Sequence, residues 1–428
     1  MKTLLKNSKL WNHPLMLVLR ENKGNPRALT LMEPLWGIPY NLIAPFATLY
    51  MYMQGITDVQ IGLILSIAMV VQVFFSFSGG IITDKLGRKR TTLIGDFMGW
   101  SMACLVWAIS NNFWLFLLAA LLNSFEYINQ TSWFCLLIED VKKKDLIGLM
   151  TLVTLAGLVA VFVAPISGLL IQNHGVVPVV RVLYLIFSIN MALKVFFTWR
   201  FCQETKQGKI RKEETKGVPV GVMLAEYKQV FGLIMRNNEM LKMIAVTVIL
   251  RINQLISTTF FGLFVTQRLG VAEEYLAYFP ILNAAVMLVF MVFIQHYLEK
   301  LKFRIPMWGG LILYAVSVVL LILTPVGNIP LIIVYIFLAA VATAVAGPRA
   351  NALLQINIED GERARINSVI VAFSIAFVSP FGYIAGWLSS IDRRLPFVLV
   401  VLIFIAAIII VGRIKEPELG EEESTLKT

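Results

Sequence analysis

The chain has 428 residues, of which 58% are hydrophobic and only 15% are charged, and its mean hydropathy is +0.77. Soluble domains are far less apolar, so this composition indicates an integral membrane protein. The net charge of +11 might suggest binding to nucleic acid. The basic residues lie in short segments between apolar runs, however, and membrane topology explains them better than one basic soluble domain.

The apolar runs have the length of membrane-spanning helices. A hydrocarbon core about 30 Å thick needs roughly 20 residues per helix, and the chain offers about twelve such runs, which are continuous rather than alternating. We therefore predict an all-α protein of two six-helix bundles. The predicted spans are 29–53, 57–83, 91–110, 112–137, 146–172, 178–201, 239–266, 273–298, 305–325, 329–356, 365–390 and 395–413.

The segments outside the two bundles are polar or amphipathic. Residues 1–28 mix lysine and arginine with leucines and Trp11, which predicts an amphipathic segment at the membrane surface. A signal peptide is the alternative, but Pro14 interrupts its short apolar run. Residues 203–238 are predicted to link a bundle at 29–202 to a bundle at 239–413, and 414–428 form an acidic tail.

Lysine and arginine are distributed unequally between the two sets of loops, and this bias predicts orientation. One side carries Lys85, Arg88, Lys89, Arg90, Lys142, Lys143, Lys144, Lys300, Lys302, Arg304, Arg363 and Arg365. The other side carries only Arg181, Arg268, Arg393 and Arg394. We predict that both termini and the linker face the cytoplasm of a multi-pass protein in the cell membrane.

The turn GGIITDKLGRKR, at residues 79–90, joins the second and third predicted spans. Its charged side chains cannot lie in hydrocarbon, so they mark a membrane surface. Gly80 permits a neighbouring helix to approach closely, and Gly87 supplies a left-handed turn position. The pattern G-x-x-x-D-[RK]-x-G-[RK]-[RK] is matched by Gly80, Asp84, Lys85, Gly87, Arg88 and Lys89. It resembles the loop signature of the major facilitator superfamily.

This resemblance implies parallel six-span halves that hold a small-molecule substrate between them near mid-membrane. It also implies that Asp84 contacts the start of the eleventh span, where free backbone amides favour an anion. We expect a monomer that uses protons as the coupling ion and contains no cofactor. No paired cysteine spacing or ligand cluster indicates a metal site, and no phosphate-binding loop or nucleophile with a base indicates an enzyme.

The two halves contain matching features, which argues for duplication. Residues 295–304 align with the 79–90 turn, so that Glu299 and Lys300 correspond to Asp84 and Lys85. Residues 138–140 recur as 358–360, and each fifth span of a half contains a central proline, Pro165 or Pro380. The antiporter signature of the superfamily is only partly present, as Gly148, Gly157, Ala164, Pro165 and Gly168.

Polar residues inside four spans are the candidates for the transport site, because an ionisable group at the bilayer centre costs at least ~2.5 kcal/mol. The proton-coupling candidates are Glu126 and Glu33. The substrate-cavity candidates are Tyr40, Asn41, Asn123, Tyr127, Gln130, Trp133, Arg251, Gln254, Thr258 and Arg349. Glu126 either carries a proton or forms a permanent pair with Arg251. We assign Asp96 to a charge network at the cytoplasmic surface and Glu33 to helix-end packing or proton carriage.

The sequence predicts a secondary active transporter that works by alternating access and exports small amphipathic or apolar molecules in exchange for protons. The alternative is proton-coupled or facilitated uptake of a sugar, peptide or other small metabolite. Lipid translocation and a non-transporting membrane receptor are more distant alternatives. Intact glycines and an intact acid in the 79–90 turn favour a transporter over a receptor.

Overall fold

The computed structural model describes residues 19–142, 145–221, 232, 234–298, 301–356 and 363–414. Over this part of the chain every regular element is a helix. Several predictions concern residues outside it: most of the amphipathic segment, Lys143 and Lys144, the repeat pair Glu299 and Lys300, residues 358–360, and nearly all of the acidic tail.

The first half follows the predicted spans closely, with breaks inside four of them. It comprises α3 (Asn25–Ile43), a 3₁₀ turn (Ala44–Phe46), α4 (Ala47–Met53), α5 (Asp58–Leu86), α6 (Arg88–Asp96), a π turn (Phe97–Met102), α7 (Ala103–Ile109), α8 (Phe113–Asn123), α9 (Glu126–Ile138), α10 (Leu146–Val161), α11 (Ala164–His174) and α12 (Val176–Phe201).

The linker and the second half are also helical where described. Helix α13 (Lys206–Glu214) begins the linker. The second half comprises α15 (Asn238–Leu263), a π turn (Phe264–Arg268), a 3₁₀ turn (Glu273–Ala277), α16 (Phe279–Phe293), α17 (Gln295–Leu298), α18 (Arg304–Leu323), α19 (Ile329–Ile356), α20 (Arg363–Ile391) and α21 (Leu395–Gly412).

Proline has different effects at corresponding places in the two halves. Pro165 lies in the first turn of α11, where a proline needs no hydrogen-bond donor, and the fifth span is divided there into α10 and α11. Pro380 instead lies inside α20, which runs without a break from Arg363 to Ile391. The equivalent helices therefore differ in continuity.

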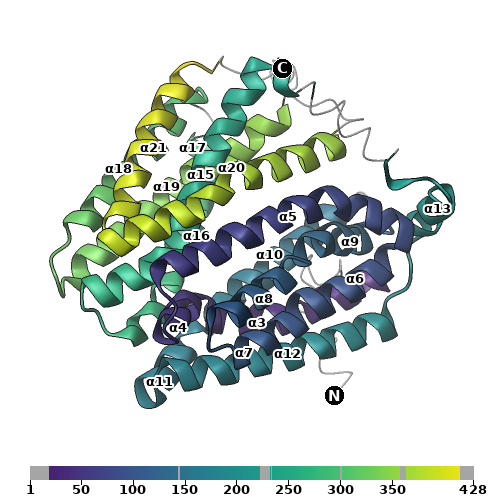
Figure 1. Cartoon of the computed structure of the whole chain (residues 1–428). Coiled ribbons are helices and arrows are strands. Elements are labelled where there is room, and N and C mark those ends of the chain that lie inside the picture. The colour runs from purple at the N-terminus through teal and green to yellow at the C-terminus, as the bar shows by residue number, and fades with distance from the viewer. Residues whose placement is uncertain are drawn as a thin grey trace, which may run out of the picture.

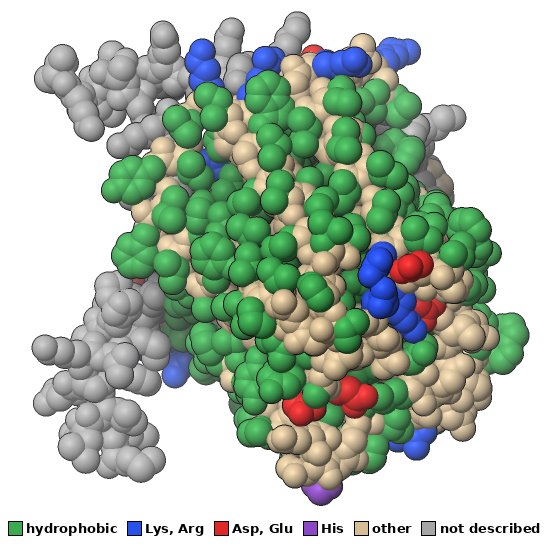
Figure 2. All heavy atoms as spheres, turned by 90° about the vertical axis from the view of Figure 1, so that its left-hand side faces the viewer, with side chains coloured by type: hydrophobic (Ala, Val, Ile, Leu, Met, Phe, Trp, Pro, Cys, Tyr) green, Lys and Arg blue, Asp and Glu red, His purple; other side chains and the backbone are tan. Residues whose placement is uncertain are grey.

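The surface and the helix lengths are those of a membrane protein. Ten helices of the described part are long and apolar enough to cross a bilayer. The first and fourth predicted spans are divided at Ala44–Phe46 and around Ser124, so the count of twelve stays a prediction. Figure 2 shows hydrophobic side chains over most of one face, with lysine and arginine gathered along one edge.

The helices form two groups, and α5 and α20 lie side by side between them (Figure 1). We call the end that carries the 79–90 turn the motif end. The other end, where α5 begins and α20 finishes, is called the opposite end. The contacts between the halves that the structure describes residue by residue lie at the opposite end, where α11 also packs on the 3₁₀ turn before α16. A Cβ on Gly168 would lie 2.8 Å from the carbonyl oxygen of Glu274.

Candidate functional site

The 79–90 turn is a sharp junction between α5 and α6. Gly87 has φ 93° and ψ 156°, a conformation that only glycine adopts readily. Its positive φ is the left-handed turn position predicted for this glycine, and its extended ψ redirects the chain from α5 into α6. A close helix approach falls on Gly79, where a Cβ would lie 3.3 Å from the backbone of Ile128 in α9.

The acid of the motif, Asp84, lies between two guanidinium groups. Its Oδ1 is 2.8 Å from Nη1 of Arg88, and its Oδ2 is 2.9 Å from Nη2 of Arg211 in α13. Arg88 also donates to Glu139 at the end of α9, from 3.0 Å. The described contacts of Asp84 therefore join α5 to α6 and to the linker, while its predicted contact with the start of the eleventh span stays a prediction, because residues 357–362 lie outside the described part of the chain.

The start of the linker is fastened to the first half at several more points. The Glu204 carboxylate accepts hydrogen bonds from the backbone amides of Arg88 and Lys89, at 2.9 and 3.2 Å. These amides form the first turn of α6, where a negative charge is favourable. Lys85 donates to the carbonyl of Val218. Hydrogen bonding to Asp84 raises the pKa of the Arg211 guanidinium, as expected for a stabilised pair.

An ion pair closes the interface between the halves at the opposite end. Nη1 of Arg393, just after α20, lies 3.0 Å from Oδ2 of Asp58, the first residue of α5. Asp58 is buried and also accepts a hydrogen bond from Ser389. The Arg393 guanidinium lies 4.9 Å from the ring centre of Tyr52. Removing one partner of such a pair costs about 3–5 kcal/mol when the other charge is left buried and uncompensated, so Asp58 needs Arg393 while the halves are closed here.

One turn further along, glycines let the two backbones touch. A Cβ on Gly62 would lie only 2.3 Å from the carbonyl oxygen of Gly382, and one on Gly386 only 2.5 Å from that of Asp58. Small residues permit such close crossings in membranes.

The next contact in the same crossing involves Ser66. Its hydroxyl donates to the carbonyl of Ser379 and accepts from the amide of Tyr383 at 2.8 Å. In a regular helix that carbonyl and amide would bond to each other directly. Ser66 of α5 therefore bonds to both polar groups of one backbone turn of α20, next to Pro380.

Buried charges meet inside the first half. Nζ of Lys194 in α12 lies 3.7 Å from Oε2 of Glu33 in α3 and 3.8 Å from Oδ2 of Asp96 in α6. Asp96 also accepts a hydrogen bond of 2.7 Å from Asn129 in α9. Asp96 is 1% exposed, so its assignment to a surface charge network was wrong: it is a member of this internal cluster. Glu33 belongs to the cluster as well.

Glu126 lies beside this cluster but is less enclosed. It is half-buried, accepts a hydrogen bond of 3.3 Å from Gln130, and is close enough to Asp96 and Lys194 for their charges to interact. Asn123 donates to the carbonyl of Gly99 instead of reaching Glu126. Among the described residues no ion pair joins Glu126 to Arg251, so the alternative of a permanent pair is not realised in this conformation.

Aromatic rings surround the same part of the first half. Trp36 and Tyr40 are stacked with ring centres 4.9 Å apart, and Trp100 meets both edge-on. Tyr40 is 40% exposed. Trp133 lies 5.9 Å from Nζ of Lys194. Asn41, by contrast, donates to the carbonyl of Gly37 in its own helix.

The polar face of the second half is partly as predicted. Arg251, Gln254 and Thr258 are all exposed and lie on one side of α15, and Arg251 interacts electrostatically with Tyr127 across the halves. Arg349 differs, because it is 8% exposed and donates to the carbonyl of Val345 in its own helix. Its position is therefore internal to the second half.

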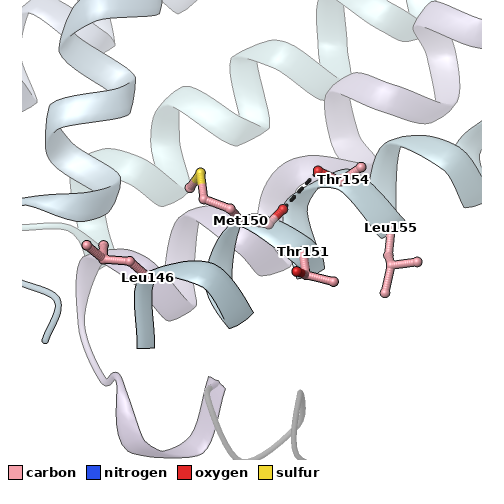
Figure 3. Close-up of a pocket in the computed structure, with 5 residues that line it drawn as sticks. All are labelled: Leu146, Met150, Thr151, Thr154 and Leu155. Carbon is pink, nitrogen blue, oxygen red and sulfur yellow. Dashed lines mark hydrogen bonds between the residues drawn. The ribbon is translucent and has the colours of Figure 1, made fainter. Parts of the chain in front are cut away.

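One hollow in the described surface lies away from these residues. It measures about 440 Å³ and is lined by Leu146, Met150, Thr151, Thr154 and Leu155, all from α10 (Figure 3). Thr154 donates to the backbone carbonyl of Met150, so that hydroxyl is already satisfied. None of the predicted site residues lines this hollow. The described residues contain no group of His, Cys, Asp and Glu that could hold a metal ion.

Sequence reasoning missed Lys194, Arg211 and Ser66. Lys194 had a usable signal, since a lysine within an apolar run is costly and marks a functional or paired position. Arg211 is one of many charges in a polar linker, and its partner Asp84 is more than 120 residues away along the chain. Ser66 is an ordinary serine in a span, and its role depends on which helix lies against it.

A helical membrane protein whose two halves are fastened at one end has the construction of a membrane transporter. A family model described as Major Facilitator Superfamily matches residues 36–378. The chain therefore belongs to the major facilitator superfamily, as the 79–90 turn had indicated. Over 80 residues it is 35% identical to the uncharacterized MFS-type transporter YqjV of Bacillus subtilis (strain 168), a match that covers 18% of this chain and only 19% of that relative.

Solved structures of transporters share the fold. A mutant of the nucleoside transporter NupG has a TM-score of 0.73 at 15% identity, covering 91% of this chain and 100% of its own. A POT family transporter bound to a thioalcohol-conjugated peptide has 0.68 at 14%, covering 93% and 98%. A bacterial homologue of the human lysosomal transporter Spinster, inward-facing and unoccupied, has 0.70 at 14%, covering 94% and 97%. At these identities the likeness concerns the fold alone.

Proposed function

We propose that this protein is a proton-coupled secondary transporter that exports small amphipathic or apolar molecules by alternating access. The observation that carries the proposal is the one-ended closure, in which Asp58, Arg393 and the glycine crossing join the halves at the opposite end. Alternating access needs two such arrangements, one for each side. The Asp58–Arg393 ion pair belongs to only one of these two arrangements and must break in the other.

The basic loops assign the motif end to the cytoplasm, by the positive-inside rule. With this orientation both termini are cytoplasmic, the protein spans the cell membrane, and the described conformation is open towards the cytoplasm. Arg211 and Glu204 then hold the beginning of the linker on the cytoplasmic face of the first half.

We infer the substrate class from aromatic and polar side chains that are at least partly exposed in the two halves. The stacked pair of Trp36 and Tyr40 offers aromatic surface to an apolar or ring-bearing molecule. Tyr127, Gln130 and the exposed face of α15 supply hydrogen bonds around it. An amphipathic molecule satisfies both kinds of surface.

Uptake of a polar metabolite is the second candidate, and a specific observation favours it. Arg251 of one half and the carboxylate of Glu126 in the other both lie near Tyr127, an arrangement that suits a substrate with two opposite charges. The fold neighbours named above include a nucleoside transporter and a peptide-bound transporter. The two candidates differ in direction and in the polarity of the substrate.

Purified protein in a ligand screen by thermal shift, followed by transport into proteoliposomes, distinguishes them. If the protein is an exporter, we expect an imposed proton gradient to drive lipophilic cations or aromatic compounds against their concentration gradient. Protons then move in the opposite direction. Proton movement in the same direction as a polar metabolite would establish the uptake candidate. Transport that ignores the proton gradient for every stabilising ligand would contradict proton coupling.

A further inference from the structure

The buried charged cluster of the first half contains more acids than bases. Glu33, Asp96 and Lys194 come from three helices, and together they carry two negative charges and one positive charge when all are ionised. Lys194 is 4% exposed, the side chain of Glu33 is 13% exposed, and Asp96 is 1% exposed. A buried charge without a partner costs several kcal/mol, so a net charge of minus one is unfavourable here.

We propose that Glu33, Asp96 and Lys194 form a proton-binding site in which the two carboxylates share one proton. This inference rests on the proton-coupled transport proposed above and identifies the group that binds the coupling ion. The sequence predicted Glu126 or Glu33 as the proton-coupling residue, and this proposal adds Asp96 and Lys194.

The geometry supports a shared proton. The ammonium nitrogen is nearly equidistant from the two carboxylates, at 3.7 and 3.8 Å, so it does not neutralise one in preference to the other. Oε2 of Glu33 and Oδ2 of Asp96 are both inaccessible to solvent, and they accept no hydrogen bond from any residue that the structure describes. Like charges that share one cation favour protonation of one member. A proton on either oxygen makes the cluster neutral.

The groups around the cluster leave Glu126 as its outlet. From α9, Asn129 donates to Asp96, the Trp133 ring lies 5.9 Å from Nζ of Lys194, and Glu126 interacts with the charges of Asp96 and Lys194. Helix α10, which also packs on α3, has no ionisable residue between Leu146 and Val161. Glu126 thus lies between the enclosed cluster and the exposed side chain of Gln130.

Proton transfer through this arrangement is chemically simple. The carboxyl O–H of the cluster gives its proton to a water molecule, since no hydrogen bond joins the cluster to Glu126 among the described residues, and the Glu126 carboxylate accepts the proton from water and releases it to solvent. The cluster is then left with one uncompensated negative charge, which favours rebinding of a proton or a rearrangement of the helices around Lys194. No oxidation or covalent step is involved.

The test uses Asp96→Asn and Glu33→Gln in proteoliposomes with a ligand found in the thermal-shift screen. Each change leaves one acid and one lysine, a neutral pair that needs no proton. We expect loss of uphill transport with exchange of substrate retained, and an exchange rate that no longer varies with pH as in the wild type. Asp140→Asn, which removes an exposed carboxylate of the same half, should behave as wild type.

Infrared difference spectroscopy between acidic and alkaline buffer gives a readout that does not need transport. We expect the carbonyl band of a protonated carboxyl in the wild type and in Glu126→Gln, and its loss in Asp96→Asn. Lys194→Met leaves two acids that both need protons, so we expect alkaline pH to lower its melting temperature more than that of the wild type.

The outcomes separate the two proposals. A wild type that is insensitive to the proton gradient overturns the proposed function. A wild type that is coupled, together with Asp96→Asn and Glu33→Gln variants that keep uphill transport and the wild-type pH profile, overturns this site while the function stands. Should those variants not fold, absence of the carboxyl band from wild type and from Glu126→Gln overturns the shared proton.

Discussion

Gly62→Ala adds one methyl group where the two halves cross. That Cβ would lie 2.3 Å from the carbonyl oxygen of Gly382 and 3.1 Å from the Cα of Gly386, whereas real contacts are essentially never shorter than 3.0 Å. The backbones of α5 and α20 must therefore separate by at least about 0.7 Å. Neither neighbour is a flexible side chain that can turn away.

Overpacking of this kind costs about 1–3 kcal/mol. Here it destabilises only the conformation in which the halves touch at the opposite end. A differential cost of that size shifts the balance between the two conformations by about 5- to 150-fold. We expect Gly62→Ala to fold normally and to populate the conformation that is open at the opposite end.

The shift can be measured as a distance between spin labels. Asn111 in the first half and Val326 in the second are both exposed in loops at the opposite end, so cysteines there can carry the labels. We expect longer distances in Gly62→Ala than in the parent protein. Gly309→Ala is the matched control, since a Cβ on Gly309 meets nothing within 4 Å. A distance distribution in Gly62→Ala identical to that of the control would refute the argument.

Three further predictions concern the motif end and the space between the halves. Asp84→Asn and Arg211→Gln should each release α13 and slow transport several-fold, measurable as faster proteolysis of the linker; equal cleavage in wild type and variants would contradict the contact. Glu126→Gln should retain substrate exchange but lose gradient-driven transport, because the buried cluster loses its outlet for protons, and uphill transport with the wild-type pH dependence would show that Glu126 does not lie on the proton path. Single cysteines at Gln254 and Thr258 should react with a small hydrophilic thiol reagent and be protected by substrate, while inertness in every condition would indicate solid packing. Burial raises the pKa of the native Cys202 thiol to about 11, so that residue should stay unreactive.

The sequence predicted those features that depend on one residue type with a strong energetic preference, such as apolar residues in a membrane or glycine in a sharp turn. Apolar run lengths predicted the helices, and the spacing of Gly87 and Asp84 predicted both a sharp turn and the family. The partners of those residues were not predictable, because they come from distant parts of the chain. Asp84 binds Arg211 of the linker, and nothing local to either residue indicates this pair.

The depth of each polar residue within the membrane was also hard to predict from the sequence. Asp96 was placed at the surface because it follows the basic turn by only six residues, yet α6 carries it inward by about 9 Å at 1.5 Å per residue. That rise is enough to bring it to Lys194. The prediction that Arg349 lines the cavity depended on its distance from a helix end. That distance says nothing about which side of α19 the residue occupies. Helix rotation is set by packing and is weakly encoded in a run that is hydrophobic all round.

The attachment of α13 determines where this chain can be cut. Residues from Glu204 to Val218 contact α5, α6 and the end of α9, so they belong structurally to the first half although they follow its last span. A first half ended at Phe201 would lack Arg211, Val218 and Glu204, which bind Asp84, Lys85 and the α6 amides. Two separately expressed fragments should therefore reassemble when the first extends past Val218, and an inserted reporter domain belongs after that residue rather than before it.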